Sequence, residues 1–480
     1  MAQNILLIIL FINILFIFAM IFIERKKPQV IISWLMIMVF APVLGFSFYL
    51  LIGSGLSVST RMLVKNRRAF SEQIKLYHKK NISTDDLEKI NKDAESIAQF
   101  NKRSYGSQIF LNNNVTIYND GLSKIDSLKQ SLTSAKSSIN MEYYIFADDK
   151  IGCDIMDILC KKAMEGVKVK LIYDSVGCLR APRRFFKRLK RAGGEVAEFF
   201  PPFMGIRVIN FKVNYRNHKK LAIIDGKTAF IGGINIREDH MGRSKKLSPW
   251  RDTHCKIEGE SVAGFQSHFF VDWRFCKKIT SPPNDLFKSE YFPAQEKKGT
   301  AFVQSIASGP DEKTQQIKDT MIKMMQTAKK SIVLQTPYLI PDESFMTALK
   351  MAHMSGVDVN VFIPDRPDKK IVYAATLSYA KDLTEIGIKV WLYKGFMHSK
   401  VLMIDDTAIT IGSCNADNRS FELNFELNAV IYCKKTCDDF AKMVEKDKIH
   451  SLLATNYLFR HKPLLTKLAQ ALFRLFSPLL

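Results

Sequence analysis

The sequence predicts an α/β protein made of two homologous halves that follow a membrane-spanning helical hairpin. Three observations support this: two long apolar runs near the N-terminus, a strand–helix–strand order that returns about 190 residues later, and a polar motif that ends each copy. The chain has 480 residues, with 70 Lys+Arg against 47 Asp+Glu and a formal charge of +23. This length accommodates about three folded units, which argues against disorder or a small disulfide-stapled fold.

The two apolar runs are expected to form the transmembrane hairpin. Residues 5–23 are apolar except for Asn13, and a helix of this length, at about 1.5 Å per residue, spans the roughly 30 Å core of a bilayer. Residues 30–52 form the second run, broken only by small or tolerated residues. The alternative is a cleavable signal peptide. It is disfavoured because no basic residue precedes the first run, no small-residue cleavage site follows it, and a second run comes next.

Two observations bear on the orientation of the hairpin. Three cationic residues lie between the runs and four follow the second, so the positive-inside rule is nearly balanced. The eight cysteines are scattered without metal-binding spacing, which favours free thiols in a reducing compartment. We therefore expect the bulk of the chain on the cytoplasmic side.

The rest of the chain shows the repeated α/β order. In the first copy a strand at 141–146 precedes a helical pattern, Gly166 and an alternating strand, and the second copy has the same order around Gly356. This order implies parallel strands in a sheet covered by helices. The predicted units are a hairpin (1–60), a basic linker and helical segment (61–115), a first half (116–290), a second half (291–460) and an amphipathic C-terminal helix (461–480).

Each half ends in the same polar motif. An H-x-K-x4-D pattern is followed at identical spacing by Gly-Gly or Gly-Ser and then an asparagine. Histidine and lysine at i and i+2 along a strand lie on one face. One match is weak, but two matches that each end a copy of a repeated unit indicate a catalytic site. The residues are His218, Lys220, Asp225 and Asn235 in the first half, and His398, Lys400, Asp405 and Asn415 in the second.

These residue types suit attack on a phosphodiester. The diester is anionic, so a neutral imidazole beside fixed cations is a suitable nucleophile. Lysine cations hold the nonbridging oxygens, each contact at 4 Å being worth about 4 kcal/mol at a dielectric constant of 20 before desolvation, and asparagine amides donate to the same oxygens. One histidine attacks phosphorus while the other exchanges protons with the leaving and incoming alcohols. This chemistry needs no metal or other cofactor, and the sequence lacks the carboxylate clusters of a Mg²⁺ phosphotransferase.

The paired motifs resemble those of the phospholipase D superfamily, and longer strings resemble the bacterial cardiolipin synthases within it. The resemblance covers nearly the whole chain, and it implies two phospholipase D-like halves packed as one pseudo-twofold unit. One departure is the pair Gly232-Gly233, where the superfamily often has Gly-Ser. The strings that carry the resemblance are 142–146, 214–218, 250–254, 336–338 with 341–342, and 418–428.

The resemblance implies a reaction. Two phosphatidylglycerol molecules would become cardiolipin and glycerol through a phosphatidyl-histidine intermediate. His218 is assigned as the nucleophile and His398 as the general acid and base, although the residues alone also permit the reverse. The two imidazoles need different environments, because a nucleophile is neutral and an acid is protonated at the same pH.

Four acidic residues are assigned to the site. Glu426, at the superfamily's carboxylate position, is expected to orient the imidazole of His398, and Asp252 the imidazole of the other motif. Asp225 and Asp405 belong to the motifs and are candidate catalytic residues. For these two, anchoring of the loop is favoured over direct chemistry.

Two segments are expected to contact a lipid surface. The stretch between Arg180 and Lys220 is strongly basic and interleaved with Phe and Pro, which suits approach to anionic headgroups with aromatic residues in the interface. A solvated helix face is the alternative for residues 183–191. The C-terminal segment is expected to form an interfacial helix, with a packed terminal helix as the alternative. Its apolar stripe is Leu464, Leu465, Leu468, Leu472, Leu475, Phe476 and Leu479, opposite Lys467, Gln470 and Arg474.

The resemblance also implies a location and partners. It predicts a multi-pass protein of the bacterial plasma membrane, whose partners are phosphatidylglycerol and other anionic lipids. Nucleic acid fits the charge and the paired motifs, but the hairpin and the lipid-synthase strings argue against it. A silent membrane scaffold is disfavoured because both motifs are complete. A hydrolase that releases phosphatidic acid and a donor such as phosphatidylethanolamine stay open, as does the oligomeric state.

Overall fold

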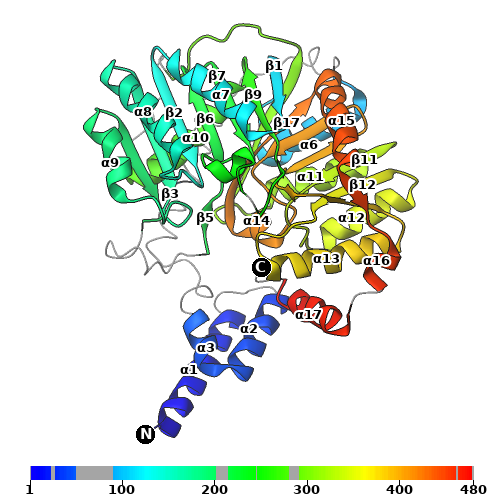
Figure 1. Cartoon of the computed structure of the whole chain (residues 1–480). Helices are drawn as coiled ribbons and strands as arrows, with labels where there is room; N and C mark the ends of the chain where they lie inside the picture. The colour runs from blue at the N-terminus through cyan, green and yellow to red at the C-terminus, as the bar shows by residue number, and fades with distance from the viewer. Residues whose placement is uncertain are drawn as a thin grey trace.

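The computed structural model describes residues 2–22, 28–49, 67, 90–201, 214–244, 246–279, 291–460 and 463–477 (Figure 1). Its α/β part is one continuous sheet that passes through two halves of the same topology. In sheet order the first half holds β1 (Phe110–Tyr118), β9 (His254–Glu258), β7 (Thr228–Gly232), β6 (Lys220–Ile224), β2 (Ser138–Tyr143), β3 (Lys168–Asp174) and β4 (Glu195–Phe199). The second half holds β10 (Ala301–Ser308), β17 (Asn424–Tyr432), β16 (Ala408–Gly412), β15 (Val401–Ile404), β11 (Ser331–Gln335), β12 (Asp358–Pro364), β13 (Lys389–Tyr393) and β18 (Ser451–Leu453).

The predicted strand–helix–strand units are present in both halves. Helix α8 (Lys150–Met164) joins β2 to the parallel strand β3, and α12 (Glu343–Met354) joins β11 to the parallel strand β12. On α8 the residues Ile155, Met156 and Leu159 are buried at helical spacing and pack against the sheet. The two halves meet where β1 pairs antiparallel with β10. The prediction of a duplicated α/β fold is therefore confirmed, and β1 begins inside the segment that was assigned to the linker.

Helices cover both faces of each half. On one face, the helices of the first half pack on one hydrophobic core and the helices of the second half on another. On the other face, α10 and α15 pack on a third core, to which both halves contribute. The two halves therefore form one folded unit. The helices are α7 (Gly121–Thr133), α8 and α9 (Arg183–Arg191) on the first core, α6 (Lys92–Tyr105), α11 (Gln316–Thr327), α12 and α13 (Lys370–Glu385) on the second, and α10 (Val262–Lys277) and α15 (Lys434–Ile449) on the shared core.

Two short strand pairs connect the halves near their motifs. β5 (Arg216–Asn217) pairs in parallel with the start of β17, and β8 (Trp250–Arg251) pairs in parallel with β14 (Phe396–Met397). β5 ends just before His218, and β14 ends just before His398. Each motif histidine is thus placed by a strand of the opposite half.

The N-terminal region agrees with the prediction in its first helix. Residues 3–22 of α1 (Ala2–Phe22) are strongly apolar and carry no charged side chain, and little of this stretch is buried inside the protein. This helix is long and apolar enough to cross a membrane.

The prediction of a second continuous span over 30–52 is wrong. α2 (Pro28–Phe40) covers 13 residues, about 20 Å, and ends before Ala41. α3 (Pro42–Phe48) then folds back on α2, so that Gly45 lies against the backbone of Met38. The break has a local cause, because proline disfavours helical conformation at the residue before it, and Ala41 has φ −141° and ψ 68°. Residues 50–52 lie outside the described residues.

The aromatic residues of the basic stretch belong to the core. Phe185, Phe186, Phe199 and Phe200 are all buried, so the expectation that these side chains enter a lipid interface is wrong. The cations of α9 instead lie on its exposed face, as the alternative of a solvated helix face predicts. Residues 202–213, which include the predicted positions Phe203, Arg207 and Lys212, lie outside the described residues. Of the other cations, Arg216, Lys219 and Lys220 are buried.

The C-terminal helix α17 (Leu464–Leu475) packs against α13 with its polar side. Arg474 forms an ion pair with Asp382 at 2.7 Å, and Gln470 is only 7% exposed. Leu468 and Leu472 point away from the protein and are 57% and 49% exposed. The helix lies beside α2 and below α13 (Figure 1), and the hydroxyl of Ser33 in α2 donates to the carbonyl of Leu475 at 3.1 Å. The side chains at 464–467 and the residues 478–480 are not described.

Candidate active site

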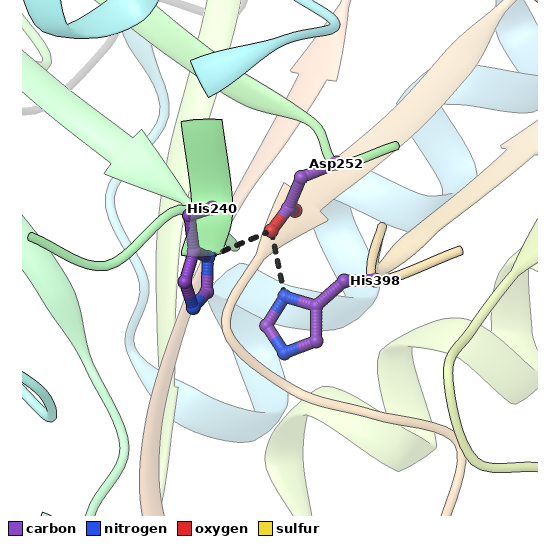
Figure 2. A group of neighbouring side chains, drawn as sticks. All are labelled: His240, Asp252 and His398. Atoms are coloured by element: carbon purple, nitrogen blue, oxygen red, sulfur yellow. Dashed lines mark hydrogen bonds and ion pairs between the residues drawn. The ribbon is translucent and has the colours of Figure 1, made fainter. Parts of the chain in front are cut away.

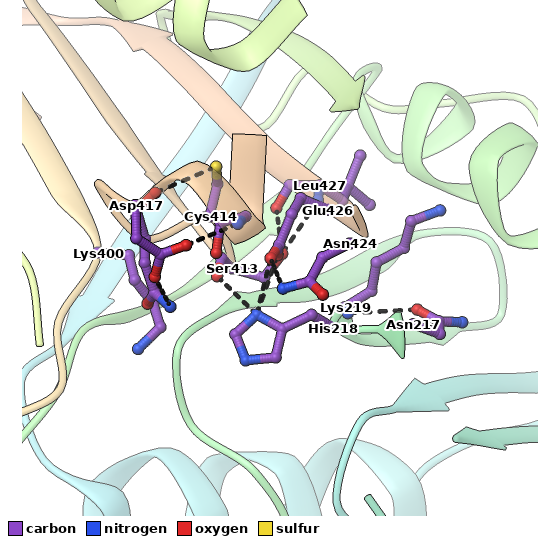
Figure 3. A network of polar contacts seen from close by, with 12 residues as sticks. Asn217, His218, Lys219, Lys400, Ser413, Cys414, Asp417, Asn424, Glu426 and Leu427 are labelled. Atoms are coloured by element: carbon purple, nitrogen blue, oxygen red, sulfur yellow. Dashed lines mark hydrogen bonds and ion pairs between the residues drawn. The ribbon is translucent and has the colours of Figure 1, made fainter. Parts of the chain in front are cut away.

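The imidazole of His218 is held by residues of the second half (Figure 3). Its Nδ1 lies 2.9 Å from Oε1 of Glu426 and 3.1 Å from the carbonyl oxygen of Ser413. Glu426 also accepts hydrogen bonds from the hydroxyl of Ser413 and from the side-chain amide of Asn424 at 3.1 Å. With Nδ1 donating to the carboxylate, Nε2 keeps a lone pair for attack. The ring of Tyr144 lies 4.9 Å from the His218 ring, centroid to centroid.

The imidazole of His398 is held by residues of the first half (Figure 2). Its Nδ1 lies 2.6 Å from Oδ2 of Asp252, and its backbone N–H donates to the carbonyl of Arg251 at 2.7 Å. Oδ1 of Asp252 accepts from the backbone N–H of Thr253 at 2.8 Å. A second imidazole, that of His240, lies on the other side of Asp252, with Nδ1 3.7 Å from the same Oδ2.

The carboxylates are exchanged relative to the sequence prediction. We expected Glu426 beside His398 and Asp252 beside the other histidine, whereas the structure pairs Glu426 with His218 and Asp252 with His398. The reason is the strand pairing between halves, because each carboxylate comes directly after two residues that pair in parallel with the strand before the opposite histidine. These residues are 424–425 for Glu426 and 250–251 for Asp252. Spacing along the chain cannot reveal which half supplies the partner.

The Gly-Gly departure from the superfamily pattern has a structural reason. A Cβ atom at Gly233 would overlap Oδ1 of Asp252, so the glycine makes room for this carboxylate. At the equivalent position of the second half, Ser413 donates its hydroxyl to Glu426 instead. Asp252, with the shorter side chain, thus lies beside glycine, and Glu426, with the longer side chain, lies beside serine.

The two motif lysines are buried beside the histidines. Lys220 and Lys400 are 1% and 2% exposed, and each Nζ donates to the backbone carbonyl of the histidine two residues earlier. Burial lowers the pKa of Lys220 to about 7, although Glu426 acts in the opposite direction. Burial likewise lowers the pKa of Lys400 to about 8, opposed by Asp252. A nearby anion would therefore strongly favour the charged form of both lysines.

Both motif histidines are neutral in the free protein at pH 7. Burial lowers the pKa of His218 to about 4, with Glu426 opposing the shift and Lys220 and Lys400 adding to it. Burial, with Lys400, also holds the pKa of His398 well below its usual value. The charge of Lys400 acts on His218 across the boundary between halves, which indicates that the two motifs form one site. Neutral imidazole is the form that a nucleophile requires.

The carboxylates beside the histidines are ionised. Burial alone would raise the pKa of Asp252, but the interactions with His398 and His240 and the charge of Lys400 outweigh it and hold this pKa well below the usual value. The pKa of Glu426 is also lowered, because His218 and Lys220 outweigh the effect of burial. Each imidazole therefore has an anionic partner at neutral pH.

The motif aspartates lie away from the histidines, at the far ends of β6 and β15. Asp225 has φ 53° and accepts hydrogen bonds from the backbone N–H groups of residues 136–138. Asp405 has φ 49° and accepts from those of residues 329–331. Both side chains anchor the start of a neighbouring strand, as the favoured interpretation predicts. The structure does not bring either of them to the reacting histidines.

The two motif asparagines have different partners. Oδ1 of Asn235 accepts from the backbone N–H of Ile145 at 3.1 Å, and its amide nitrogen lies 3.3 Å from Nε2 of His240. The amide nitrogen of Asn415 donates to Asp417 at 3.0 Å. In the part of the chain that the structure describes, Oδ1 of Asn415 is buried without a hydrogen-bond partner, so it can accept from a bound substrate.

Sequence reasoning missed His240. It lies in a short 3₁₀ helix, Glu238–Met241, five residues after Asn235, and no periodic pattern or motif singles it out. Its ligand atoms and those of Asp252 and His398 lie within 4.8 Å of one another, close enough to share a metal ion. The 2.6 Å contact between Asp252 and His398 is equally the geometry of a histidine–carboxylate hydrogen bond, which needs no metal.

Comparisons with known proteins show the family to which the chain belongs. A family model described as "Cardiolipin synthase, PLD-like domain" matches residues 128–248 and 321–448, one segment in each half. The cardiolipin synthase of Listeria innocua is 39% identical, over 99% of this chain and 98% of its own. The major cardiolipin synthase of Bacillus subtilis is 38% identical, over 100% of this chain and 99% of its own.

A solved structure shares the fold. It is that of phosphatidylserine synthase from Haemophilus influenzae, which matches with a TM-score of 0.61 and 14% sequence identity. The match covers 80% of this chain and 100% of the other. Both paired α/β halves thus have a counterpart among structures already determined.

Proposed function

Because this chain belongs to the cardiolipin synthase family of phospholipase D-like enzymes, we propose that it joins two phosphatidylglycerol molecules into cardiolipin and releases glycerol. It is a phosphatidyltransferase that acts on phospholipid. The observation that carries the proposal is the pair of histidine–carboxylate contacts, each with a buried lysine, that the two halves build together. Two imidazoles with ionised partners are what a two-step transfer needs.

In the first step Nε2 of His218 attacks the phosphorus of one phosphatidylglycerol. The P–N bond forms, the P–O bond to glycerol breaks, and His398 gives its proton to the leaving oxygen. In the second step His398 takes the proton from a hydroxyl of another phosphatidylglycerol. That oxygen attacks phosphorus, the P–N bond breaks, and cardiolipin leaves with the enzyme restored.

The negative charge of the substrate favours the protonation states that these two steps need. Lys220 and Lys400 contact the nonbridging oxygens, and the bound anion favours their charged forms. The same anion raises the pKa of His398, which must carry a proton for the first step, while Asp252 stabilises the imidazolium. Oδ1 of Asn415 accepts a hydrogen bond from a glycerol hydroxyl. Both lysines and His398 are thus charged when the phosphodiester is bound, while His218 stays neutral for the attack.

The enzyme acts at the bacterial plasma membrane. We infer that α1 crosses the bilayer and that the catalytic halves lie on the cytoplasmic side. α17 supports an interfacial position, because its polar side packs against the protein while Leu468 and Leu472 face outward. The cationic face of α9 gives a further surface that attracts anionic lipid.

The test is to follow labelled phosphatidylglycerol with the purified protein in detergent. We expect labelled cardiolipin and free glycerol from the wild-type enzyme, and neither product from His218→Ala or His398→Ala. Only His218→Ala should also fail to form a covalent lipid adduct with an activated donor. His450→Ala, an exposed histidine at the end of α15, is the matched control.

Other products would overturn the proposal. Phosphatidic acid as the main product would identify a hydrolase, and cleavage of single-stranded DNA under the same conditions would identify a nuclease. Substantial cardiolipin synthesis by either histidine variant would exclude the two-histidine mechanism.

A further inference from the structure

His240 occupies a buried position that the two-histidine mechanism does not use (Figure 2). It is 3% exposed, and its Nδ1 lies 3.7 Å from Oδ2 of Asp252, the oxygen that contacts His398. The His240 ring stands edge-on to the ring of His398, with centroids 5.0 Å apart and planes at 89°. The ring of Trp250 packs on both, at 4.2 Å from His240 and 5.1 Å from His398. His240 therefore touches both members of one histidine–carboxylate pair.

The other pair has no counterpart to this imidazole among the described residues. Glu426, which holds His218, accepts from the hydroxyl of Ser413 and the amide of Asn424, and neither of these groups titrates. Asp417, which contacts Asn415 as His240 contacts the first motif's asparagine, is a carboxylate. The two motifs are thus equivalent in their histidines and lysines but differ in what supports the carboxylate.

This difference matches the different tasks of the two histidines. A nucleophile must be neutral when it attacks and needs a fixed tautomer, whereas an acid and base must release and regain a proton in each turnover and return to the same orientation. The groups that face His240 are Asp252, His398, Lys400 and Lys220, so its surroundings contain one anion that His398 shares. Because His240 contacts both Asp252 and the ring of His398, it restrains the two side chains while the proton moves.

We propose that His240 is a positioning residue for proton transfer: it holds Asp252 and the imidazole of His398 so that Nε2 of His398 faces the alcohol oxygen in both steps. This inference rests on the proposed function, in which His218 forms the P–N bond. It also assigns the role of general acid and base to His398, because His240 contacts the Asp252–His398 pair and has no counterpart at His218 among the described residues. Removing the nitrogens of His240 should slow proton transfer and leave the attack by His218 intact.

An activated donor separates these two events. In the p-nitrophenyl ester of phosphatidic acid, the leaving group departs as p-nitrophenolate without needing a proton. Formation of the P–N bond then requires His218 but no acid, whereas transfer to phosphatidylglycerol still requires a base. Rapid mixing measures p-nitrophenolate released in the first turnover, and chromatography measures cardiolipin and the trapped protein adduct.

The informative variant is His240→Phe, which keeps a ring against Trp250 and removes both nitrogens. We expect first-turnover release of p-nitrophenolate within about twofold of wild type. Cardiolipin formation should fall on the order of 10- to 100-fold, a part of the 10²–10⁴ that acid–base catalysis supplies, and the adduct should accumulate. His240→Gln, which retains a hydrogen-bonding group, should recover part of the lost turnover. His450→Phe controls for replacing a histidine by phenylalanine elsewhere.

Two results would overturn the inference. Equal losses of p-nitrophenolate release and cardiolipin formation in both His240 variants would show a general structural role, and unchanged turnover would show no role. Failure of the proposed function looks different. The wild-type enzyme would then release no p-nitrophenolate, or His218→Ala would release it at the wild-type rate.

Discussion

At the scale of single residues, the space left by Gly233 determines where the Asp252 carboxylate lies. The backbone at 232–233 runs against residues 252–254, and the N–H of Gly233 donates to the carbonyl of Thr253 at 2.8 Å. A side chain here would push the carboxylate away from His398. The glycine is therefore part of the catalytic geometry, although it carries no functional group.

Gly233→Ala should consequently lower cardiolipin formation with little loss of folding. We expect a decrease of about 100-fold, because His398, the proposed general acid and base, loses its orienting partner. Ser413→Ala, the equivalent position in the other half, removes one hydrogen bond to Glu426 and should cost less, about 10-fold. Turnover assays in detergent, with melting temperatures measured alongside, check both values. Wild-type activity in Gly233→Ala would contradict the explanation that glycine stands here, in place of the usual serine, to make room for Asp252.

The buried lysines make substrate binding depend on pH. In the free protein the pKa values of Lys220 and Lys400 are about 7 and about 8, so both are largely neutral at pH 9. An anionic diester favours their charged forms, so binding must take up protons above these pKa values. Affinity should therefore fall as pH rises, by about tenfold per pH unit for each lysine that must be charged.

This dependence can be measured with a phosphonate analogue of phosphatidylglycerol that is not cleaved. Calorimetry in buffers of different ionisation enthalpy should show net proton uptake on binding at pH 8.5. Lys220→Arg should reduce the uptake, since arginine stays protonated. Affinity that does not change between pH 7 and 9.5 would contradict the role of these lysines.

At the scale of elements, α17 has an arrangement opposite to that of an ordinary surface helix. Arg474 and Gln470 face the protein, whereas Leu468 and Leu472 are exposed. Full burial of a leucine side chain is worth about 1.5–3 kcal/mol, so a lipid surface would stabilise this helix where water does not. α1, which belongs to the same N-terminal group of helices as α2, is the one described element long enough to cross the bilayer.

The double variant Leu468→Glu, Leu472→Glu should therefore lose activity on phosphatidylglycerol vesicles, by about 10-fold or more. Activity in detergent micelles should stay near wild type, because a micelle presents substrate without a fixed surface. The matched control is Met351→Glu, Met354→Glu on α12, where the two side chains are 62% and 82% exposed. Equal losses in the two double variants would show a nonspecific effect of added negative charge.

The sequence was sufficient to predict the elements that depend on local pattern. The strand–helix–strand units and the motif histidines and lysines follow from periodicity and spacing within one half. The break after Phe40 could also have been inferred, because Pro42 restricts the residue before it. The aromatic residues 185–186 alternate with cations at helical spacing, which is the pattern of a helix with one buried face.

What depends on contacts between halves could not be predicted. The partner of each histidine is set by β5 with β17 and by β8 with β14, and these short strands have no signal of their own. His240 lacks any motif and gains its role only from its distance to Asp252. These features require the fold to be known first.

At the scale of the whole molecule, a buried charge network joins three parts of the chain. Arg67, from the segment after the N-terminal helices, donates Nε to Asp272 of the first half at 2.9 Å and forms an ion pair with Asp311 of the second. Lys219, next to His218, also pairs with Asp272. Burial alone would lower the pKa of Arg67, but Asp272 and Asp311 raise it. The pKa of Asp272 is lowered in turn, because Arg67 and Lys219 outweigh the effect of burial.

Asp272→Asn should therefore destabilise the whole enzyme. Two buried cations would lose their shared anion, and breaking a buried ion pair costs about 3–5 kcal/mol. Asp358→Asn removes an ion pair to Lys389 in which both side chains are 50% exposed, and it should cost less than about 1 kcal/mol. Denaturant unfolding in detergent measures both free energies of unfolding. Similar values for the two variants would show that the network does not hold the parts together.

The exchange of carboxylates between halves also has a consequence for the evolution of a chain with two copies of one unit. A single copy of the unit would lack the partner of its own histidine, so it could work only as a pair of identical chains. Once two copies are fused, a substitution in one copy no longer appears twice in the site. The ancestral symmetry can then be lost one position at a time. Glycine against serine, aspartate against glutamate, and histidine against aspartate beside the motif asparagines are the differences that this freedom permits.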